Sequence, residues 1–235
     1  MAMAALVVAS APVIATTWAP DKVQDPVNKD RIDVQQPASS GSYIYQWPGK
    51  SDQVFWPFTD GAWLWFNPGS GYIAFGNDFK EIDPPRLEAL RVWLKANYDR
   101  ANAPRTRLEL LLWAERVYSA RGMSNDFWCH FYRLMAFETR SDEAVSLAYI
   151  RKAIPLLADR LNSESEAGPT MEALYLLGEY NRRLGNAADA DRYLAQLTSF
   201  EASGEMSGFK AYLLEIAWEQ RNPPADNPPE QTREQ

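Results

Sequence analysis

The stretch that decides the fold runs from Ala173 to Leu197 and reads ALYLLGEYNRRLGNAADADRYLAQL. Its apolar residues recur at intervals of three and four, which is the period of an amphipathic α-helix. Gly185-Asn186 interrupts this pattern, and a glycine at such a place is typical of a helix end. Thr170 is the expected N-terminal cap of the first helix. The sequence therefore predicts a helical hairpin, with helices over residues 171–184 and 187–199.

The helical period continues on both sides of this hairpin. Asp83-Pro84-Pro85 is a helix start, because an aspartate caps the first N–H groups and proline is tolerated in the first turn. Other helices are expected to begin near Pro104, Asn125, Ser141 and Ser207. Pro155 lies inside the fourth helix and is expected to kink or divide it. We predict a helical array over residues 83–221 and a disordered tail over 222–235.

The segment before the helices has a different composition. Between Tyr43 and Phe79 there are twelve aromatic residues in 37 positions, against 13% for the whole chain. Four short runs with strand character end at turn signals, at 43–47, 53–58, 62–66 and 71–75. Such spacing predicts a small aromatic-rich β module over 43–82, in the form of a meander or ribbon. Its rings are expected to form core or an interface with the helices, with an exposed ligand platform as the alternative.

The N-terminal residues suggest export. Residues 1–15 are small and apolar, and Val13-Ile14-Ala15 has the spacing of a signal-peptidase site. No lysine or arginine precedes Lys22, so the usual basic start is missing, and a flexible or buried strand is the alternative. We expect a signal peptide over 1–15 and a periplasmic or secreted protein without a transmembrane span. Residues 16–42 are predicted to be an extended lead-in with few fixed elements.

The composition narrows the classes of function. The 235 residues are 46% hydrophobic and 23% charged, as in a globular chain with a real core. A net charge of −7 argues against nucleic-acid binding. With one cysteine and one histidine, no zinc or iron site, and no cofactor, is expected. Cys129 and His130 are adjacent on a predicted helix and point about 100° apart. We therefore interpret them as structural residues and not as a catalytic pair, and we expect no enzyme.

The decisive hairpin resembles a tetratricopeptide repeat. Small residues stand where its helices approach each other, and leucines complete the inner stripe, at Gly178, Ala190, Leu194 and Leu197. The pair around Ala144 fits poorly, so the resemblance covers one good repeat and two degenerate helix pairs. It implies a binding groove lined by Glu172, Tyr175, Glu179, Arg182 and Arg183. The two arginines could clamp an acidic or C-terminal carboxylate group, and a solvated basic patch at a helix end is the alternative.

The turn Asn67-Pro68-Gly69-Ser70-Gly71-Tyr72, followed by Ala74-Phe75, carries a second, fainter resemblance. It is similar to an uncharacterised bacterial family that joins a zinc-ribbon-like module to tetratricopeptide-like helices. That family carries Cys-Pro-x-Cys-Gly-Tyr-x-Ala-Phe at this place. Here Asn67 and Ser70 occupy the two ligand positions, and neither residue type holds zinc well. The resemblance implies the architecture and argues against the metal.

Together these patterns predict an α+β, mainly α protein with a small aromatic-rich β module followed by tetratricopeptide-like α-hairpins. The first functional hypothesis is a non-catalytic adaptor for protein–protein interaction or assembly, which binds a protein or peptide partner through the helical groove. The alternative is a glycan-binding module in the β segment that uses Trp47, Trp56, Trp63 and Trp65. Buried tryptophans would count against the glycan hypothesis, and several rings on one exposed face would favour it.

Overall fold

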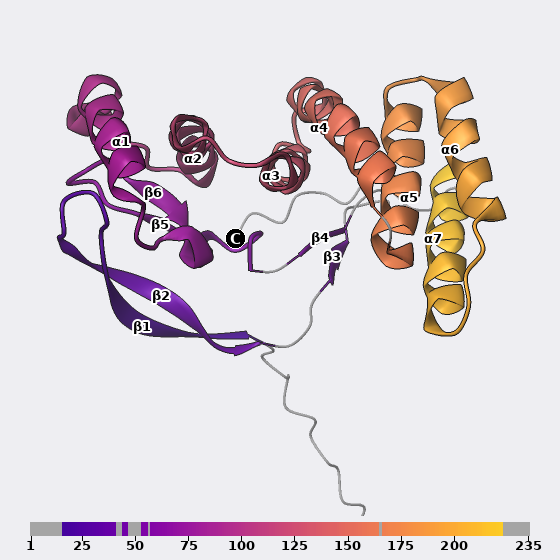
Figure 1. Ribbon diagram of the computed structural model, residues 1–235, viewed down its shortest axis with the longest axis horizontal. Helices are drawn as coiled ribbons and strands as arrows, with labels where there is room; N and C mark the ends of the chain where they lie inside the picture. Colours follow the sequence, from indigo (N-terminus) through magenta and orange to yellow (C-terminus); the bar gives the residue numbers. More distant parts are fainter. Residues whose placement is uncertain (1–15, 41–43, 47–52, 56, 165, 223–235) are drawn as a thin grey trace, which may run out of the picture.

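The protein is α+β and mainly α, as the sequence predicted. The structure is a computed structural model that describes residues 16–40, 44–46, 53–55, 57–164 and 166–222. These residues contain seven α-helices, which follow one another along the molecule with the strands beneath the first of them (Figure 1). The helices are α1 Pro84–Asn97, α2 Arg107–Arg121, α3 Asn125–Glu138, α4 Glu143–Ser163, α5 Ala167–Arg183, α6 Ala187–Ser199 and α7 Glu205–Arg221.

The strands form three separate two-stranded antiparallel sheets. They are β1 Thr16–Gln24 with β2 Arg31–Ser40, β3 Ile44–Gln46 with β4 Gln53–Phe55, and β5 Leu64–Phe66 with β6 Ile73–Phe75. The four short strands expected between residues 43 and 75 are therefore present, but as two independent pairs and not as one meander. One bound was wrong, because Gly61–Trp63 forms a 3-10 turn before β5, with Asp60 as its cap.

The expected lead-in over residues 16–42 is instead mostly a β-hairpin, so the prediction of few fixed elements was wrong. β1 and β2 pair from Thr16 opposite Ser40 to Gln24 opposite Arg31. The turn between them is fixed by local hydrogen bonds, including Lys29 N–H to the Asp25 carbonyl at 2.9 Å. Lys29 itself has a φ of 66°. The prolines in this segment argue against strands and for turns, so the sequence pattern did not predict the hairpin.

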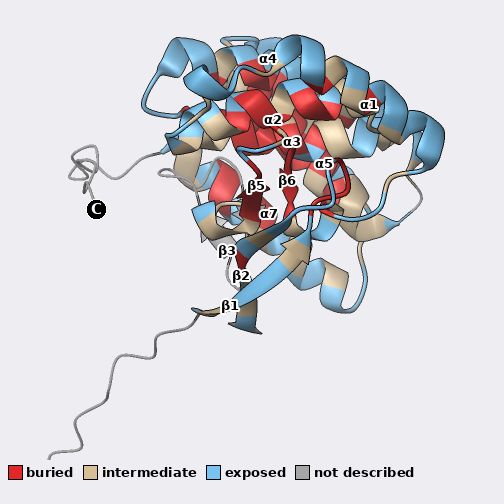
Figure 2. Cartoon of the chain, turned by 90° about the vertical axis from the view of Figure 1, so that its left-hand side faces the viewer, coloured by how far each residue is buried: buried red, intermediate tan, exposed pale blue. Residues whose placement is uncertain are grey.

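The β5–β6 pair packs on the helices and shares their core. Phe75 is buried and stacks on Tyr118 of α2, whose hydroxyl accepts a hydrogen bond from the Phe75 N–H at 2.8 Å. The Trp113 indole donates to the Gly71 carbonyl at 2.7 Å. Gly71 has a φ of 79°, and a Cβ at this position would lie 2.4 Å from the Tyr98 ring. Buried residues gather where these strands meet the helices (Figure 2).

The helix boundaries follow the capping signals. Asp83, Ser124 and Asp142 cap α1, α3 and α4 through side-chain oxygens, and Thr106 forms a capping box with Glu109 at the start of α2. α4 runs from Glu143 to Ser163 through Pro155, so the helix is not divided at this proline. None of the helices among the described residues is long and apolar enough to cross a membrane.

The α5–α6 hairpin forms as its sequence predicted. A Cβ on Gly178 would lie 2.7 Å from the Leu194 side chain, which shows why this position needs a small residue. Gly185 ends the first helix with a φ of 78°. α5 begins earlier than expected, after Glu166 and not after Thr170. α5 packs on α4, α6 and α7, so little of its circumference reaches solvent.

Candidate functional site

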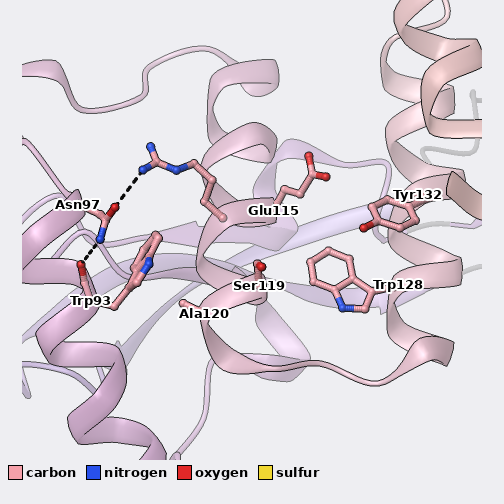
Figure 3. A pocket seen from close by; sticks show the side chains of 8 residues that line it. Trp93, Asn97, Glu115, Ser119, Ala120, Trp128 and Tyr132 are labelled. Atoms are coloured by element: carbon pink, nitrogen blue, oxygen red, sulfur yellow. Dashed lines mark hydrogen bonds between the residues drawn. The ribbon is translucent and has the colours of Figure 1, made fainter.

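An open groove lies across the first three helices. It has a volume of about 610 Å³ and is lined by Trp93 and Asn97 of α1, Glu115, Arg116, Ser119 and Ala120 of α2, and Trp128 and Tyr132 of α3. Trp93 and Trp128 stand on opposite sides of Ser119 and Ala120 (Figure 3). Its volume is within the range of pockets that hold a ligand or a peptide side chain. We call these eight residues the aromatic groove.

The aromatic groove exists because α2 has two functional faces. Trp113 and Tyr118 point toward the β5–β6 pair and bond to it. Glu115 and Arg116 lie between these positions along the helix, Ser119 follows them, and all three line the groove. The core contacts on one face fix the helix, and the other face is left for solvent or a partner.

Other rings hold the two groove tryptophans in place. Trp93 stacks on Trp113 at 5.5 Å between ring centroids, and Trp128 stacks on Tyr132 at 5.3 Å. Phe127 and Phe131 meet Trp128 edge to face. Stacked and edge-to-face pairs are favourable beyond the area they bury, so these walls are preorganised.

The two charged residues of the aromatic groove, Glu115 and Arg116, differ in their partners. Glu115 accepts from the Tyr149 hydroxyl at 2.7 Å and from the Lys152 ammonium at 2.8 Å. Burial, followed by this hydrogen bond, raises the pKa of Tyr149, so the hydroxyl stays a donor. The Arg116 guanidinium lies over Trp113 and Trp93, at 4.9 and 5.7 Å from the ring centroids. The Glu115 carboxylate thus already accepts hydrogen bonds from its neighbours, whereas the Arg116 guanidinium contacts aromatic rings.

The residues expected to line a groove on α5 are distributed differently. Tyr175 and Glu179 are buried, so they are not available to a partner in this conformation. Glu172 forms an ion pair with buried Arg133 at 2.9 Å, and Arg182 forms one with Glu179 at 2.9 Å. Arg183 contacts the Ser146 hydroxyl at 3.4 Å. The physical reason is that α7 adds a third neighbour to α5, and the sequence pattern of the hairpin alone does not reveal it.

The buried Glu179 carboxyl gives a test of this packing. Burial raises its pKa above 4.5, and Arg182 opposes the shift only in part. A carboxyl with a raised folded-state pKa contributes stability below its unfolded pKa, and this contribution is lost as pH rises through the folded value. Glu179→Gln should therefore gain melting temperature relative to the parent as pH rises from 4.5 to neutrality. The exposed Glu215→Gln is the control, and a difference for Glu179→Gln that does not change with pH would contradict the prediction.

The tryptophans of the proposed glycan platform do not form an exposed face among the described residues. Trp65 is 6% exposed, and its indole donates to the carbonyls of Gln35 and Ala62. Trp63 is half-buried and packs edge to face on Trp65. Trp47 and Trp56 lie outside the described residues. The prediction that the rings of the β module are buried as core therefore holds for Trp65 and, in part, for Trp63.

Cys129 and His130 lie next to each other on α3 and differ in burial. Cys129 is buried, as the structural interpretation expected, whereas His130 is exposed on α3. Neither residue lines the aromatic groove.

Two turns that each carry polar residues three positions apart contact each other through hydrogen bonds. Asp25-Pro26-Val27-Asn28 lies between β1 and β2, and Asn67-Pro68-Gly69-Ser70 lies between β5 and β6. The fully buried Asp25 carboxylate accepts from the Asn67 amide at 2.6 Å and from the Ser70 hydroxyl. It also accepts from the Val27 N–H at 2.6 Å. We call Asp25, Asn28, Asn67 and Ser70 the knuckle residues.

The spacing of the knuckle residues equals that of paired Cys-x-x-Cys zinc ligands. Sequence reasoning found the second turn and missed the first, although the repeated polar-Pro-x-polar pattern was a usable signal. The residues present do not fit zinc. They offer no thiol and no imidazole, and the one carboxylate is already bonded to three donors. Among the described residues there is also no group of three His, Cys, Asp or Glu side chains placed to hold a metal.

We therefore expect the purified protein to contain no stoichiometric zinc or iron. The hydrogen bonds centred on Asp25 join the two turns in the way that a metal joins them elsewhere. Elemental analysis after purification without chelators is the measurement. A value near one metal per chain would contradict the expectation.

Comparisons of this chain with protein-family models, with curated proteins and with solved structures find no match. The functional argument is therefore carried by the geometry of the aromatic groove.

Proposed function

We propose that this protein is a non-catalytic adaptor that binds a segment of another protein in the aromatic groove. The observation that carries the proposal is the groove itself, with preorganised tryptophans on either side of exposed Ser119. Aromatic residues and arginine are the types enriched at the centres of protein interfaces. The only carboxylate in the lining, Glu115, is bonded to Tyr149 and Lys152, which supports a structural use of that group.

The scaffold of this adaptor is a set of packed helix pairs of the tetratricopeptide-like kind. α3 packs on α4 and α5 packs on α6, and α4 packs on α5, so the two pairs stack side by side. The proposal differs from the sequence-based one in the surface that binds. The partner lies on α1–α3, since the corresponding surface of α5 is covered. From the sequence we further infer that the protein is exported to the periplasm or the medium.

A site-specific photo-crosslinker tests the proposal. Placed at exposed Ser119 in the full chain, it should capture a defined partner protein in the cells that produce the chain. The same crosslinker at exposed Arg192 on α6 is the control, and it should not capture that partner. Equal capture at both positions, or none at Ser119, would refute an adaptor that uses this groove. Capture of saccharide and not protein would favour the glycan hypothesis.

A further inference from the structure

We propose that the occupant of the aromatic groove is an extended acidic peptide that carries a carboxylate two residues from an apolar side chain. This inference rests on the proposed adaptor function and names the chemistry of the partner. Two features carry it: the state of Arg116 in the groove, and the exposed leucines on the same face of α2.

Arg116 is a cation that lacks an anionic partner. Within the described residues no carboxylate lies within 4.0 Å of its guanidinium, and its one hydrogen bond goes to the Asn97 amide oxygen at 3.4 Å. The guanidinium lies over the stacked indoles of Trp93 and Trp113. A guanidinium held in one orientation binds a carboxylate through two parallel hydrogen bonds with little loss of side-chain freedom. Arg116 is therefore prepared for a carboxylate that the ligand supplies.

Most of the remaining polar groups of the groove can both donate and accept, namely the Asn97 amide and the Ser119 and Tyr132 hydroxyls. Within the described part of the chain, the indole N–H groups of Trp93 and Trp128 have no acceptor. The strong acceptor Glu115 already binds Tyr149 and Lys152. An extended peptide presents N–H groups and carbonyl oxygens at regular intervals, and this lining can pair with both.

Two exposed leucines lie on the face of α2 that carries Arg116. Leu112 is 42% exposed and stands four residues before Arg116, with Leu108 one further turn away and 43% exposed. Residues four apart lie on one helix face and are separated by about 6 Å along the axis. Side chains two apart in an extended chain lie on one side, about 6.6 Å apart. A carboxylate on Arg116 thus places the side chain two residues away over Leu112.

The test uses a random peptide library displayed on phage and selected on the full-length protein. We expect enriched peptides to share an aspartate or glutamate two residues from a large apolar residue. For the tightest enriched peptide, Arg116→Glu should weaken binding by about tenfold or more, and Arg116→Lys by less, because lysine keeps the charge and loses the planar fork. Raised salt should weaken binding of the parent protein.

The matched control is Arg192→Glu on α6, which reverses an exposed arginine that pairs only with surface groups. It should bind the peptide like the parent, and near-UV circular dichroism should show that all variants keep the packed fold. Enriched peptides without an acidic residue, or equal binding by the parent and Arg116→Glu, would overturn the inference.

The same variant separates this inference from the proposed function. If the crosslinker at Ser119 captures a partner and Arg116→Glu still captures it equally, the adaptor stands and the carboxylate assignment falls. If capture at Ser119 fails with the parent protein, the adaptor function itself is refuted.

Discussion

Asp25→Ala is expected to destabilise the protein by about 3 kcal/mol, since it leaves several buried donors without an acceptor. The Asn67 amide, the Ser70 hydroxyl and the Val27 N–H all bond to this carboxylate. For a chain of this size the loss corresponds to a decrease of about 10 °C in melting temperature. Thermal melts of the parent and the variant measure it. A melting temperature within about 2 °C of the parent would show that the two turns do not depend on each other.

Asp33→Ala is the control for this prediction. Asp33 is exposed on β2 and pairs with Lys22 on the surface, where ion pairs contribute little. Its melting temperature should stay close to that of the parent. The converse experiment replaces all four knuckle residues by cysteine, which should create a zinc site, since the two turns already bring these side chains together. A quadruple variant that folds and binds no zinc would contradict the claim that the two turns bring these four side chains together.

A chain that begins at Asp83 is expected to lose its packed tertiary structure. Removal of the preceding residues uncovers the buried face of α2, including Tyr118, and leaves the Trp113 indole without the Gly71 carbonyl. It also removes the Phe58 and Val27 carbonyls that accept from Arg107 and Arg91. We expect weak near-UV circular dichroism and binding of a hydrophobic dye, as in a partly molten state.

The full chain provides the comparison for that truncation. Near-UV and far-UV signals should give one coincident unfolding transition, because the β5–β6 pair and the helices share a core. If the truncated chain instead melts sharply at the parent temperature, the β region is an independent appendage. The account of α2 as a helix fixed by its β-facing side would then be wrong.

Local sequence signals predicted the elements well. The caps Asp83 and Asp142, the stop at Gly185 and the close approach at Gly178 all act as their residue types suggest. Such features depend on neighbours within a turn or within one hairpin, so a single segment contains the information. Pro155 shows the limit, because α4 continues through it without division despite the local cost of a proline.

The binding surface could not be predicted in the same way. Tyr175 and Glu179 follow the pattern of groove-lining residues, but they are buried in a helix that packs on α4, α6 and α7, and no local signal reports these contacts. Trp93 and Trp128 stand 35 positions apart in sequence, and only the arrangement of α1, α2 and α3 brings them to one groove. The hairpin β1–β2 was missed because its prolines resemble turn signals, and the role of Asp25 was missed because two of its partners lie in another turn.

The central claim is that the partner binds between Trp93 and Trp128 and not on the β region or on α5. Nuclear magnetic resonance of the indole N–H groups tests it most directly, with each signal assigned by a tryptophan-to-phenylalanine variant and the tightest selected peptide as the titrant. The account predicts that the Trp93 and Trp128 signals shift together on binding, while the signal of Trp65, whose indole is bonded to Gln35 and Ala62, stays in place. Shifts of Trp63 and Trp65 with unchanged Trp93 and Trp128 signals would contradict it.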